Sequence, residues 1–394
     1  MDRRSFVRLI GGGAVFAAGG LGGCSGTYPE DAVAAWAGPR PDEEPRRWAL
    51  GHAVLAPSSH NRQPWLVDLR QPNAIGLHVD RARLLPETDP WFRQIVVSQG
   101  TFLELLVIAL RERGVEARVE LFPEGEFAPR TLDDRPVARL SWPAGAGDAK
   151  KDPLFAHIRA RQTAKVDYDT RRPVEPAALS ALASALPPDS GFGLGFAGSI
   201  EPARLAALRQ LCRDAARVEL TTPRTVMESI RLTRVGPREI RADPDGIALN
   251  EPLVRALGAL GLFDRSRPPA AGSAAYRNMM ARFEGHSRSA MGFVWLSTDT
   301  AANAPKGRTR SAEVTAGRAY VRLQLQATAL GLQMHPMSQA PQEFAEMKPL
   351  YDRLHALTVG RPADQRTVQM LCRIGHCAPQ PHTPRRGVDA IIRA

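Results

Sequence analysis

The chain has 394 residues, of which 43% are hydrophobic and 24% are charged, the balance of a globular protein with a sizeable core. Its four cysteines are too few for a disulfide framework. The net charge of +11 comes from dispersed basic residues rather than from blocks, so we expect no nucleic-acid partner.

Residues 1–26 have the features of an export signal. Arg3 and Arg4 resemble the pair of a twin-arginine signal, and a weakly apolar, glycine-rich stretch follows them. The run Leu21–Cys24 resembles a bacterial lipobox, which predicts lipidation of Cys24; a plain cleaved signal and an N-terminal helix of a cytosolic protein are the alternatives. We expect export by the twin-arginine route, a periplasmic or membrane-anchored lipoprotein with a possible lipid anchor at the membrane surface, and a bound cofactor.

A linker is expected over residues 27–46, and a first half of the fold over 47–150. A helix is expected near 45–56, before two alternating apolar and polar segments that form a hairpin. A long amphipathic helix follows, and Gly114 ends it. The two hairpin strands are expected at 65–69 and 75–79, the long helix at 90–113, and two later strands at 117–122 and 137–142.

The second half is expected over residues 151–394. Residues 229–269 contain Pro244, Gly246 and Pro252, and we expect a lid-like insertion there. Around it the pattern predicts helices at 154–161, 176–186, 202–219 and 317–330, and strands at 292–297 and 368–374.

Two helices of this chain share the same glycine spacing. Gly100 and Gly114 bracket one of them, and Gly317 and Gly331 bracket the other at the same interval. A strand is expected after the second glycine in each case. This single correspondence hints at an internal repeat.

The loop that precedes the first strand carries the most specific motif. Pro57, Ser58, Ser59, Asn61 and Gln63 offer hydroxyl, amide and backbone groups to a polar ligand. The loop resembles the Pro-Ser-x-x-Asn-x-Gln-Pro-Trp signature of nitroreductase-like flavoproteins; an ordinary helix-to-strand loop is the alternative. The resemblance implies that these five residues contact an FMN cofactor.

A second motif opens the second half. Its Arg161, Gln162, Thr163 and Lys165 resemble the Arg-rich start of nitroreductases, whose cations and hydroxyl hold the FMN phosphate and ribityl chain. Gln162 departs from the usual arginine, and Lys165 replaces another. Because an ammonium is a point charge rather than a planar fork, the resemblance implies a looser phosphate clamp.

Two further segments match the family. Near the C-terminus, Arg385 and Arg386 resemble the basic residue that reaches the same phosphate; a solvated basic tail is the alternative. After the second long helix, Met337, Ser338 and Gln339 match the segment whose backbone passes along the flavin ring. That resemblance implies N–H donors near flavin N5. The nearby His335 is expected to be structural rather than a catalytic base.

The order of these motifs resembles that of two fused subunits. In a nitroreductase the Arg-rich start precedes the Pro-Ser-x-x-Asn loop, whereas here it lies about a hundred residues after it. The resemblance implies an α+β, nitroreductase-like fold, in which two fused halves form an intramolecular pseudo-dimer with central antiparallel or mixed sheets flanked by helices. One flavin per chain and a monomer are expected, as in single-chain, Acg-like members.

The resemblance implies an FMN-dependent oxidoreductase that reduces nitro, quinone or similar small-molecule acceptors by two-electron transfer from flavin N5. The donor is NAD(P)H or a membrane or quinone-linked partner. A non-catalytic flavin-binding or sequestering protein is the alternative. We assign no catalytic side chain and no metal; Cys372 and Cys377 fit buried strand cysteines, or else a disulfide.

Overall fold

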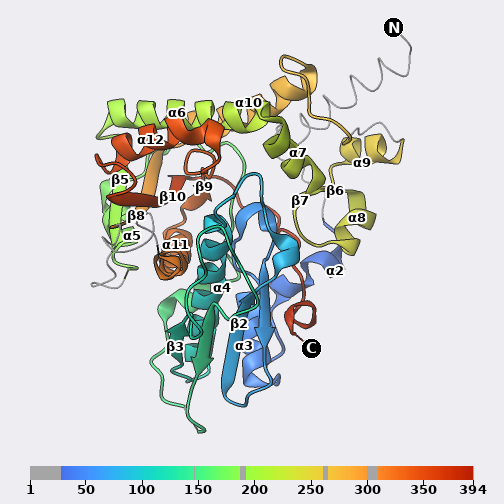
Figure 1. Cartoon of the computed structure of the whole chain (residues 1–394), viewed down its shortest axis with the longest axis vertical. Helices are drawn as coiled ribbons and strands as arrows, with labels where there is room; N and C mark the ends of the chain where they lie inside the picture. The colour runs from blue at the N-terminus through green and yellow to red at the C-terminus, as the bar shows by residue number, and fades with distance from the viewer. Residues whose placement is uncertain (1–27, 146, 187–191, 261–264, 300–308, 394) are drawn as a thin grey trace.

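The structure of this chain is a computed structural model that describes residues 28–145, 147–186, 192–260, 265–299 and 309–393 (Figure 1). The expected export signal and its Cys24 lie outside the described residues. The first described elements are the short helix α2 (Glu30–Val33) and the 3-10 turn η1 (Ala34–Ala37).

The first half builds a four-stranded antiparallel sheet with the strand order β1-β2-β4-β3. Buried and half-buried residues alternate along β1 and β4, so one face of the sheet packs against the core. Two helices and three 3-10 turns complete this half. The elements are α3 (Pro45–Ala53), η2 (Ser59–Asn61), β1 (Trp65–Asp68), β2 (Ala74–Val79), η3 (Arg81–Arg83), α4 (Arg93–Glu112), β3 (Arg118–Leu121), β4 (Ala138–Ser141) and η4 (Pro153–His157).

The second half builds a second antiparallel sheet with the strand order β5-β8-β10-β9. As in the first half, two strands precede the long helix and two follow it, and they pair in the same order. The expectation of two fused halves is therefore confirmed, and both sheets are antiparallel. The elements are β5 (Phe192–Ala197), β8 (Gly292–Asp299), α11 (Arg310–Ala329), β9 (Gln333–Pro336) and β10 (Arg366–Gly375).

Helices cover both faces of the second sheet (Figure 1). Along β8, Phe293 and Trp295 pack with residues of α6 and α12, while Val294 and Leu296 pack with residues of α11. Because neighbouring residues of a strand point to opposite faces, the continuous apolar run of β8 is buried on both sides. The covering elements are α5 (Pro176–Ala183), α6 (Pro202–Thr221), α10 (Ala274–Arg288), η6 (Ala345–Met347) and α12 (Lys348–Thr358).

The two halves meet where α4 and α11 cross. A Cβ atom on Gly100 would lie 1.9 Å from the carbonyl oxygen of Val314, and one on Gly317 would lie 1.9 Å from that of Val97. These contacts are reciprocal, as a twofold relation between the halves requires. The matched glycine spacing in the sequence thus marks two equivalent helices. Among the described residues α4 is also the one helix long and apolar enough to cross a membrane, but that stretch is completely buried in the protein.

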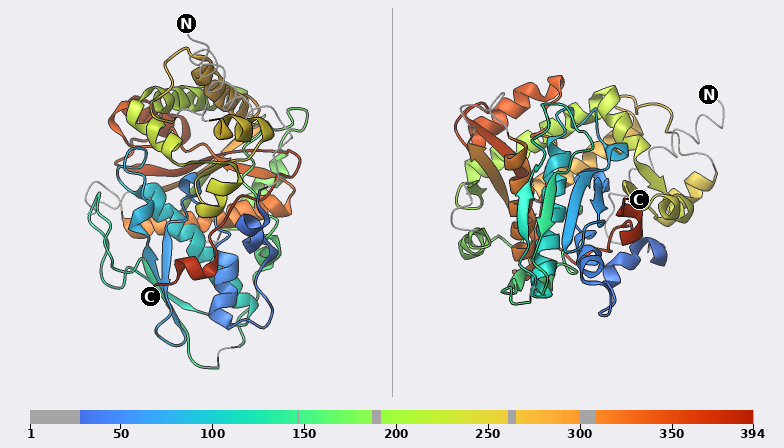
Figure 2. Two further views of the ribbon diagram at one scale, coloured as in Figure 1. Left: turned by 90° about the vertical axis from the view of Figure 1, so that its right-hand side faces the viewer. Right: turned by 60° about the horizontal axis from the view of Figure 1, so that its bottom comes forward.

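The C-terminal tail crosses back onto the first half. Ile392 bridges to Val67 of β1, and Arg393 donates its backbone N–H to the Val67 carbonyl. The 3-10 turn η7 (Val388–Ile391) packs beside α3, as the views in Figure 2 also show. This corrects the expected boundary, because residues from 385 onward pack with the first half although they belong to the second in sequence.

The expected linker and the expected lid-like insertion both lie beside the seam. Tyr28 donates its hydroxyl to the Ala248 carbonyl, so the start of the described chain packs against the insertion instead of serving as a free linker. Within the insertion, the buried Asp245 pairs with Arg62 of the first half. The elements are α7 (Pro223–Arg231), β6 (Thr233–Val235), α8 (Gly236–Ala242), β7 (Ile247–Leu249) and α9 (Pro252–Ala259), with β6 and β7 parallel.

Candidate functional site

Two adjoining cavities lie at the seam between the halves. The larger has a volume of about 810 Å³ and the smaller about 230 Å³. The larger volume falls in the range of about 300–1,000 Å³ that small-molecule and cofactor sites occupy. Both halves and the insertion contribute to the wall between the cavities, which consists of Pro57, Ser58, Thr163, Lys165, Ile247, Leu249, Arg282 and His286.

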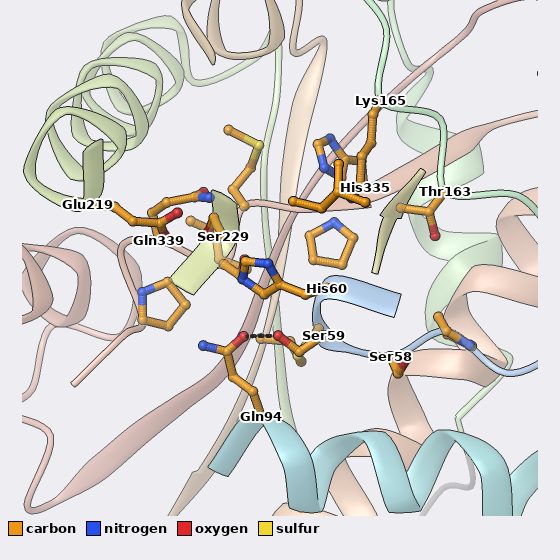
Figure 3. A pocket seen from close by; sticks show the side chains of 18 of the residues that line it. Ser58, Ser59, His60, Gln94, Thr163, Lys165, Glu219, Ser229, His335 and Gln339 are labelled. Atoms are coloured by element: carbon orange, nitrogen blue, oxygen red, sulfur yellow. Dashed lines mark hydrogen bonds between the residues drawn. The ribbon is translucent and has the colours of Figure 1, made fainter. Parts of the chain in front are cut away.

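The first half contributes the loop at residues 57–63, whose backbone is unusual. His60, Asn61 and Gln63 have φ values of 48°, 54° and 50°, a left-handed conformation that side chains other than glycine rarely adopt. Hydrogen bonds on both sides hold it, since the Gln63 N–H donates to Ser58 Oγ at 2.9 Å and Ser59 Oγ donates to Gln94 Oε1 at 2.8 Å (Figure 3). The strained loop is thereby fixed against the cavities.

Residues of this loop face different cavities. Pro57 and Ser58 line both cavities, Ser59 lines the smaller one, and Asn61 lines the larger one. His60 also lines the smaller cavity, and burial lowers the pKa of its imidazole to about 4, with the charge of Lys165 as the next cause. A neutral imidazole therefore faces the smaller cavity at neutral pH.

The second half contributes Thr163 and Lys165 to the wall between the cavities, and Arg161 to the larger cavity. Arg161 donates to the Leu55 carbonyl at 2.8 Å and to Gln324 Oε1 at 3.1 Å, and Gln324 Nε2 donates to Thr163 Oγ1 at 3.0 Å. Burial lowers the pKa of the Arg161 guanidinium to about 10. The hydrogen bonds of Arg161 thus lead to neutral oxygens and leave its positive charge without compensation.

Lys165 projects into the cavities from a rigidly held backbone. Its own carbonyl accepts from His286 Nε2 at 2.9 Å, while the carbonyls of Ala164 and Val166 both accept from the buried Arg373. The surrounding protein lowers the pKa of the Lys165 ammonium to about 8, although the side chain is exposed to the cavity and solvent there limits the effect. Arg373 also donates to His335 Nδ1 at 3.0 Å, so His335 is hydrogen-bonded within the structure.

Arg385 reaches the larger cavity from the C-terminal tail. It donates to Asn61 Oδ1 at 2.8 Å, which joins the tail to the loop of the first half. Arg385 and Arg161 lie 5.0 and 5.7 Å from the centroid of the Trp36 ring. Burial, and then the charge of Arg161, holds the pKa of Arg385 well below its usual range. Two buried cations therefore lie close together at one end of this cavity.

The charge and hydrogen bonding of the larger cavity fit an anionic group. Within the described residues, Arg161 Nε and Arg385 Nε are buried and have no hydrogen-bond partner. Like charges held together in a low-dielectric site are costly unless an anion compensates them. Among the described residues that line the cavity, the cations are Arg161, Lys165, Arg282, Arg288 and Arg385, and the carboxylates are Asp167 and Glu251.

Two of the residues that were expected to contact FMN, Gln63 and Arg386, line neither cavity. Arg386 pairs with Asp80 at 3.0 Å, and its backbone N–H donates to Gln63 Oε1 at 2.8 Å. Neither residue lines a cavity, so the expected cofactor contacts of Gln63 and Arg386 are corrected to a role in joining the tail to the loop. Gln162 lines the larger cavity but is hydrogen-bonded to the backbone of Gln380.

The segment after β9 lines the smaller cavity as expected. Met337, Ser338 and Gln339 all belong to its wall. Met337 donates its backbone N–H to the Leu371 carbonyl at 2.8 Å, so that donor is taken by the sheet. Ser338 and Gln339 are the remaining members of the expected segment that can present polar groups to a ligand.

Several residues that line the cavities were not predicted from the sequence. Trp36 lay in the expected linker, and its indole N–H donates to the Thr383 carbonyl at 2.8 Å. Glu219 and Arg282 lie on α6 and α10, where a single charged residue in a helix carries no local signal of a site. His60 occupies an unassigned position of the loop motif. Only its place between serines and Asn61 could have suggested a role.

The described cysteines are free. Cys212 and Cys372 are buried, and Cys377 is partly buried, so the structure has no Cys372–Cys377 disulfide. Within the described ranges, no three His, Cys, Asp or Glu side chains are grouped as metal ligands would be.

The sequence is similar to proteins of known classification. It is 27% identical over 359 residues to the Mycobacterium tuberculosis protein Rv3131, named as a candidate NAD(P)H nitroreductase, and the match covers 89% of this chain and 92% of that protein. The M. tuberculosis protein Acg, named in the same way, is 35% identical over 75 residues, which cover 19% of this chain and 22% of that protein. No protein-family model matches the chain.

Solved structures give a weaker similarity. The FMN-dependent nitroreductase NfnB from Mycobacterium smegmatis is 18% identical with a TM-score of 0.35, over 60% of this chain and 95% of that one. NfnB from a Sphigopyxis strain is also 18% identical, with a TM-score of 0.34, over 62% of this chain and 99% of that one.

The fold and the cavities define a class of protein with two related α+β halves and a cavity lined by several cations at their seam. The relative that matches along almost the full length and the loop motif both point to nitroreductases. The chain is similar to a candidate NAD(P)H nitroreductase over most of its length, and to Acg over 75 residues.

Proposed function

We propose that the chain binds one FMN in the larger cavity and works as an oxidoreductase on small-molecule acceptors. The observation that carries this proposal is the pair of buried arginines, Arg161 and Arg385, whose charges are not compensated by a carboxylate contact among the described residues. A phosphate dianion would compensate both, and charge-assisted hydrogen bonds to phosphate are among the strongest in proteins.

Residues of both halves would bind FMN. Arg161, Lys165 and Arg385 would hold the phosphate, and Thr163 would contact the adjoining polar chain. Asn61 and Ser58 would contact the polar edge of the ring in the larger cavity, while Ser59, Ser338 and Gln339 would face the ring from the adjoining smaller cavity. These residues come from four distant segments of the chain and line the two adjoining cavities.

Bound FMN supplies two-electron chemistry at its N5 atom. The protein's own contribution is to position that group and to keep its surroundings polar at one edge and apolar at the other. Cations and N–H groups near the ring favour negative charge there. The apolar residues of the smaller cavity exclude bulk water from the space in which an acceptor would bind.

The electron donor and the oligomeric state are part of the same proposal. We propose NAD(P)H, or a membrane or quinone-linked partner if the signal at residues 1–26 directs export. A monomer is proposed, since both halves of the seam come from one chain. Rapid anaerobic bleaching of the flavin by NADPH would argue for the nicotinamide donor, whereas no bleaching would favour the other donors.

A flavin-binding protein without turnover is the second candidate. The insertion supplies Ile230, Thr233 and Leu249 to the wall of the smaller cavity, whose volume of about 230 Å³ is below the usual range for a ligand site. A cavity of this size favours a small acceptor or none. Flavin that is bound but fails to react with any donor or acceptor would support this alternative.

Replacing Lys165 with methionine tests the binding site without disturbing the fold. We expect Lys165→Met to weaken FMN binding about tenfold at neutral pH, because one charge-assisted contact to phosphate is lost. The affinity of the parent should fall as the pH rises above about 8, where the ammonium begins to lose its proton, and that of the variant should not. Titration of FMN fluorescence at several pH values measures both effects.

The matched control is Lys151→Met. Lys151 pairs with Glu112 at 2.8 Å on the surface, away from both cavities. Its replacement should leave FMN affinity unchanged at every pH. If both lysine variants bound FMN as tightly as the parent, Lys165 would have no place in the site.

A further inference from the structure

Glu219 is a buried carboxyl group that faces the smaller cavity and that the proposed binding of FMN does not use. It lies near the end of α6, and its side-chain group is almost inaccessible to bulk solvent, with an exposed fraction of 3%. Its Oε2 atom accepts a hydrogen bond from Gln342 Nε2 at 2.7 Å. Figure 3 places it beside Gln339, and Gln339, Ser229 and His60 line the same cavity.

Neighbouring groups have opposing effects on the pKa of the Glu219 carboxyl group. Lys165 attracts the ionised form, and Glu228 of α7 repels it. The side-chain amides of Gln342 and Gln339 hydrogen-bond to it, while Arg282 and His286 of α10 line the same cavity. Burial is the largest effect and raises the pKa of Glu219 to about 7. The group is thus able to hold and release a proton near neutral pH.

The smaller cavity is suited to an uncharged, planar acceptor. Its apolar lining includes Leu220, Ile230, Leu249, Met279 and Phe283, which would contact the faces of a ring. Apolar side chains displace water from the faces of a ring bound among them, so bulk water is a poorer proton source there than in open solution. An acceptor reduced there needs a protein group to complete its protonation.

We propose that Glu219 is the proton donor to a quinone-type acceptor bound in the smaller cavity. The inference rests on the proposed function, which supplies the two-electron donor. Reduction of a quinone to the hydroquinone consumes two electrons and two protons, and a hydride delivers both electrons and one of the protons. The second proton comes from Glu219: its O–H bond breaks, and an O–H bond forms on the quinone oxygen.

The resulting Glu219 carboxylate is stabilised by groups already in place. Gln342 Nε2 donates to it, and the Lys165 ammonium is near enough to lower its pKa. After the hydroquinone leaves, the carboxylate takes up a proton from solvent that enters the emptied smaller cavity. The Lys165 side chain lines both cavities.

The kinetic test compares two acceptors in flavin-loaded protein. A soluble benzoquinone needs a proton on reduction, whereas ferricyanide takes single electrons and needs none. Glu219→Gln is expected to slow reoxidation by the quinone at least about 100-fold, the usual contribution of a general acid, and to leave reoxidation by ferricyanide unchanged. In the parent the quinone rate should fall as the pH rises through about 7, because the ionised carboxylate cannot donate; Glu219→Gln should lack this fall.

A spectroscopic readout tests the proton itself. In the infrared difference spectrum between about pH 5 and about pH 9, the parent should lose the carbonyl band of a protonated, buried carboxylic acid with a midpoint near pH 7. Glu219→Gln should lose the part of the band that Glu219 contributes, whereas buried Asp89, whose pKa is also raised to about 7, should keep its own part in both proteins. Glu219→Asp retains an acid and should restore part of the quinone rate, which also covers the case in which the glutamine variant fails to fold.

The outcomes separate this inference from the proposed function. Equal quinone rates in flavin-loaded parent and Glu219→Gln, or an unchanged infrared band, would overturn the role of Glu219 and leave flavin binding intact. Protein that binds no flavin would overturn the proposed function and this inference together. Equal slowing with quinone and ferricyanide would assign Glu219 to the structure of the site and not to proton donation.

Discussion

Replacing Gly317 with alanine is expected to lower the free energy of unfolding by more than about 4 kcal/mol, or to prevent folding altogether. The added Cβ atom would lie 1.9 Å from the carbonyl oxygen of Val97 and 3.0 Å from the Cα atom of Gly100. Both neighbours are backbone atoms of a buried helix, so they cannot move without separating α4 from α11. Denaturant unfolding of the purified variant measures the loss.

The same effect is expected for Gly100→Ala, whose Cβ atom would lie 1.9 Å from the carbonyl oxygen of Val314. The matched control is Gly198→Ala, because no described atom lies within 4 Å of the Cβ position there. That variant should stay within about 0.5 kcal/mol of the parent. Near-normal stability of Gly317→Ala would mean that the two halves do not meet at these glycines.

Replacing Arg385 with alanine is expected to weaken FMN binding about 100-fold, whereas replacing its neighbour Arg386 should change it far less. Arg385 lies in the larger cavity with an unpartnered Nε atom, so an anion there would lose a buried, charge-assisted contact worth about 2–5 kcal/mol. Arg386 is instead paired with Asp80. Isothermal titration of flavin-free protein with FMN compares the two variants.

Arg385→Ala and Arg386→Ala should lose different properties: the first should mainly lose FMN affinity, and the second should mainly lose stability. Arg386→Ala leaves Asp80 with one charged partner fewer and should therefore lower the thermal midpoint more than it lowers FMN affinity. Arg161→Ala is expected to behave like Arg385→Ala. If Arg386→Ala lost as much affinity as Arg385→Ala, the tail would act on the site as a whole, and the assignment of the phosphate to Arg385 would be wrong.

The sequence predicted most strands to within two residues, because strongly apolar runs between turn residues leave few alternatives. The expected helix over residues 317–330 began too late: α11 starts at Arg310, where Thr309 Oγ1 accepts from the Ala312 N–H as a helix cap. The glycine spacing led to the prediction that the helix starts at Gly317, but Gly317 lies where α11 crosses α4. Elements within the insertion were not predicted, since their short runs are stabilised by distant contacts such as Arg62 with Asp245.

The site was predictable where a motif is contiguous. Ser58, Asn61, Arg161 and Lys165 all line the cavities because each lies in a short segment with a recognisable pattern. Arg385 and Arg386 are adjacent and of one type, so only the path of the tail decides which of them enters the cavity. Glu219 and Trp36 reach the site through tertiary packing, which leaves no trace in local sequence.

The amount of flavin bound by the purified, folded chain tests the central claim most directly. Visible absorbance and the solution mass together should give one FMN for each single chain. The reason is that, among the described residues, the two halves form one cavity that can hold the phosphate. Two flavins per chain, or a colourless protein that also fails to take up added FMN, would contradict the account.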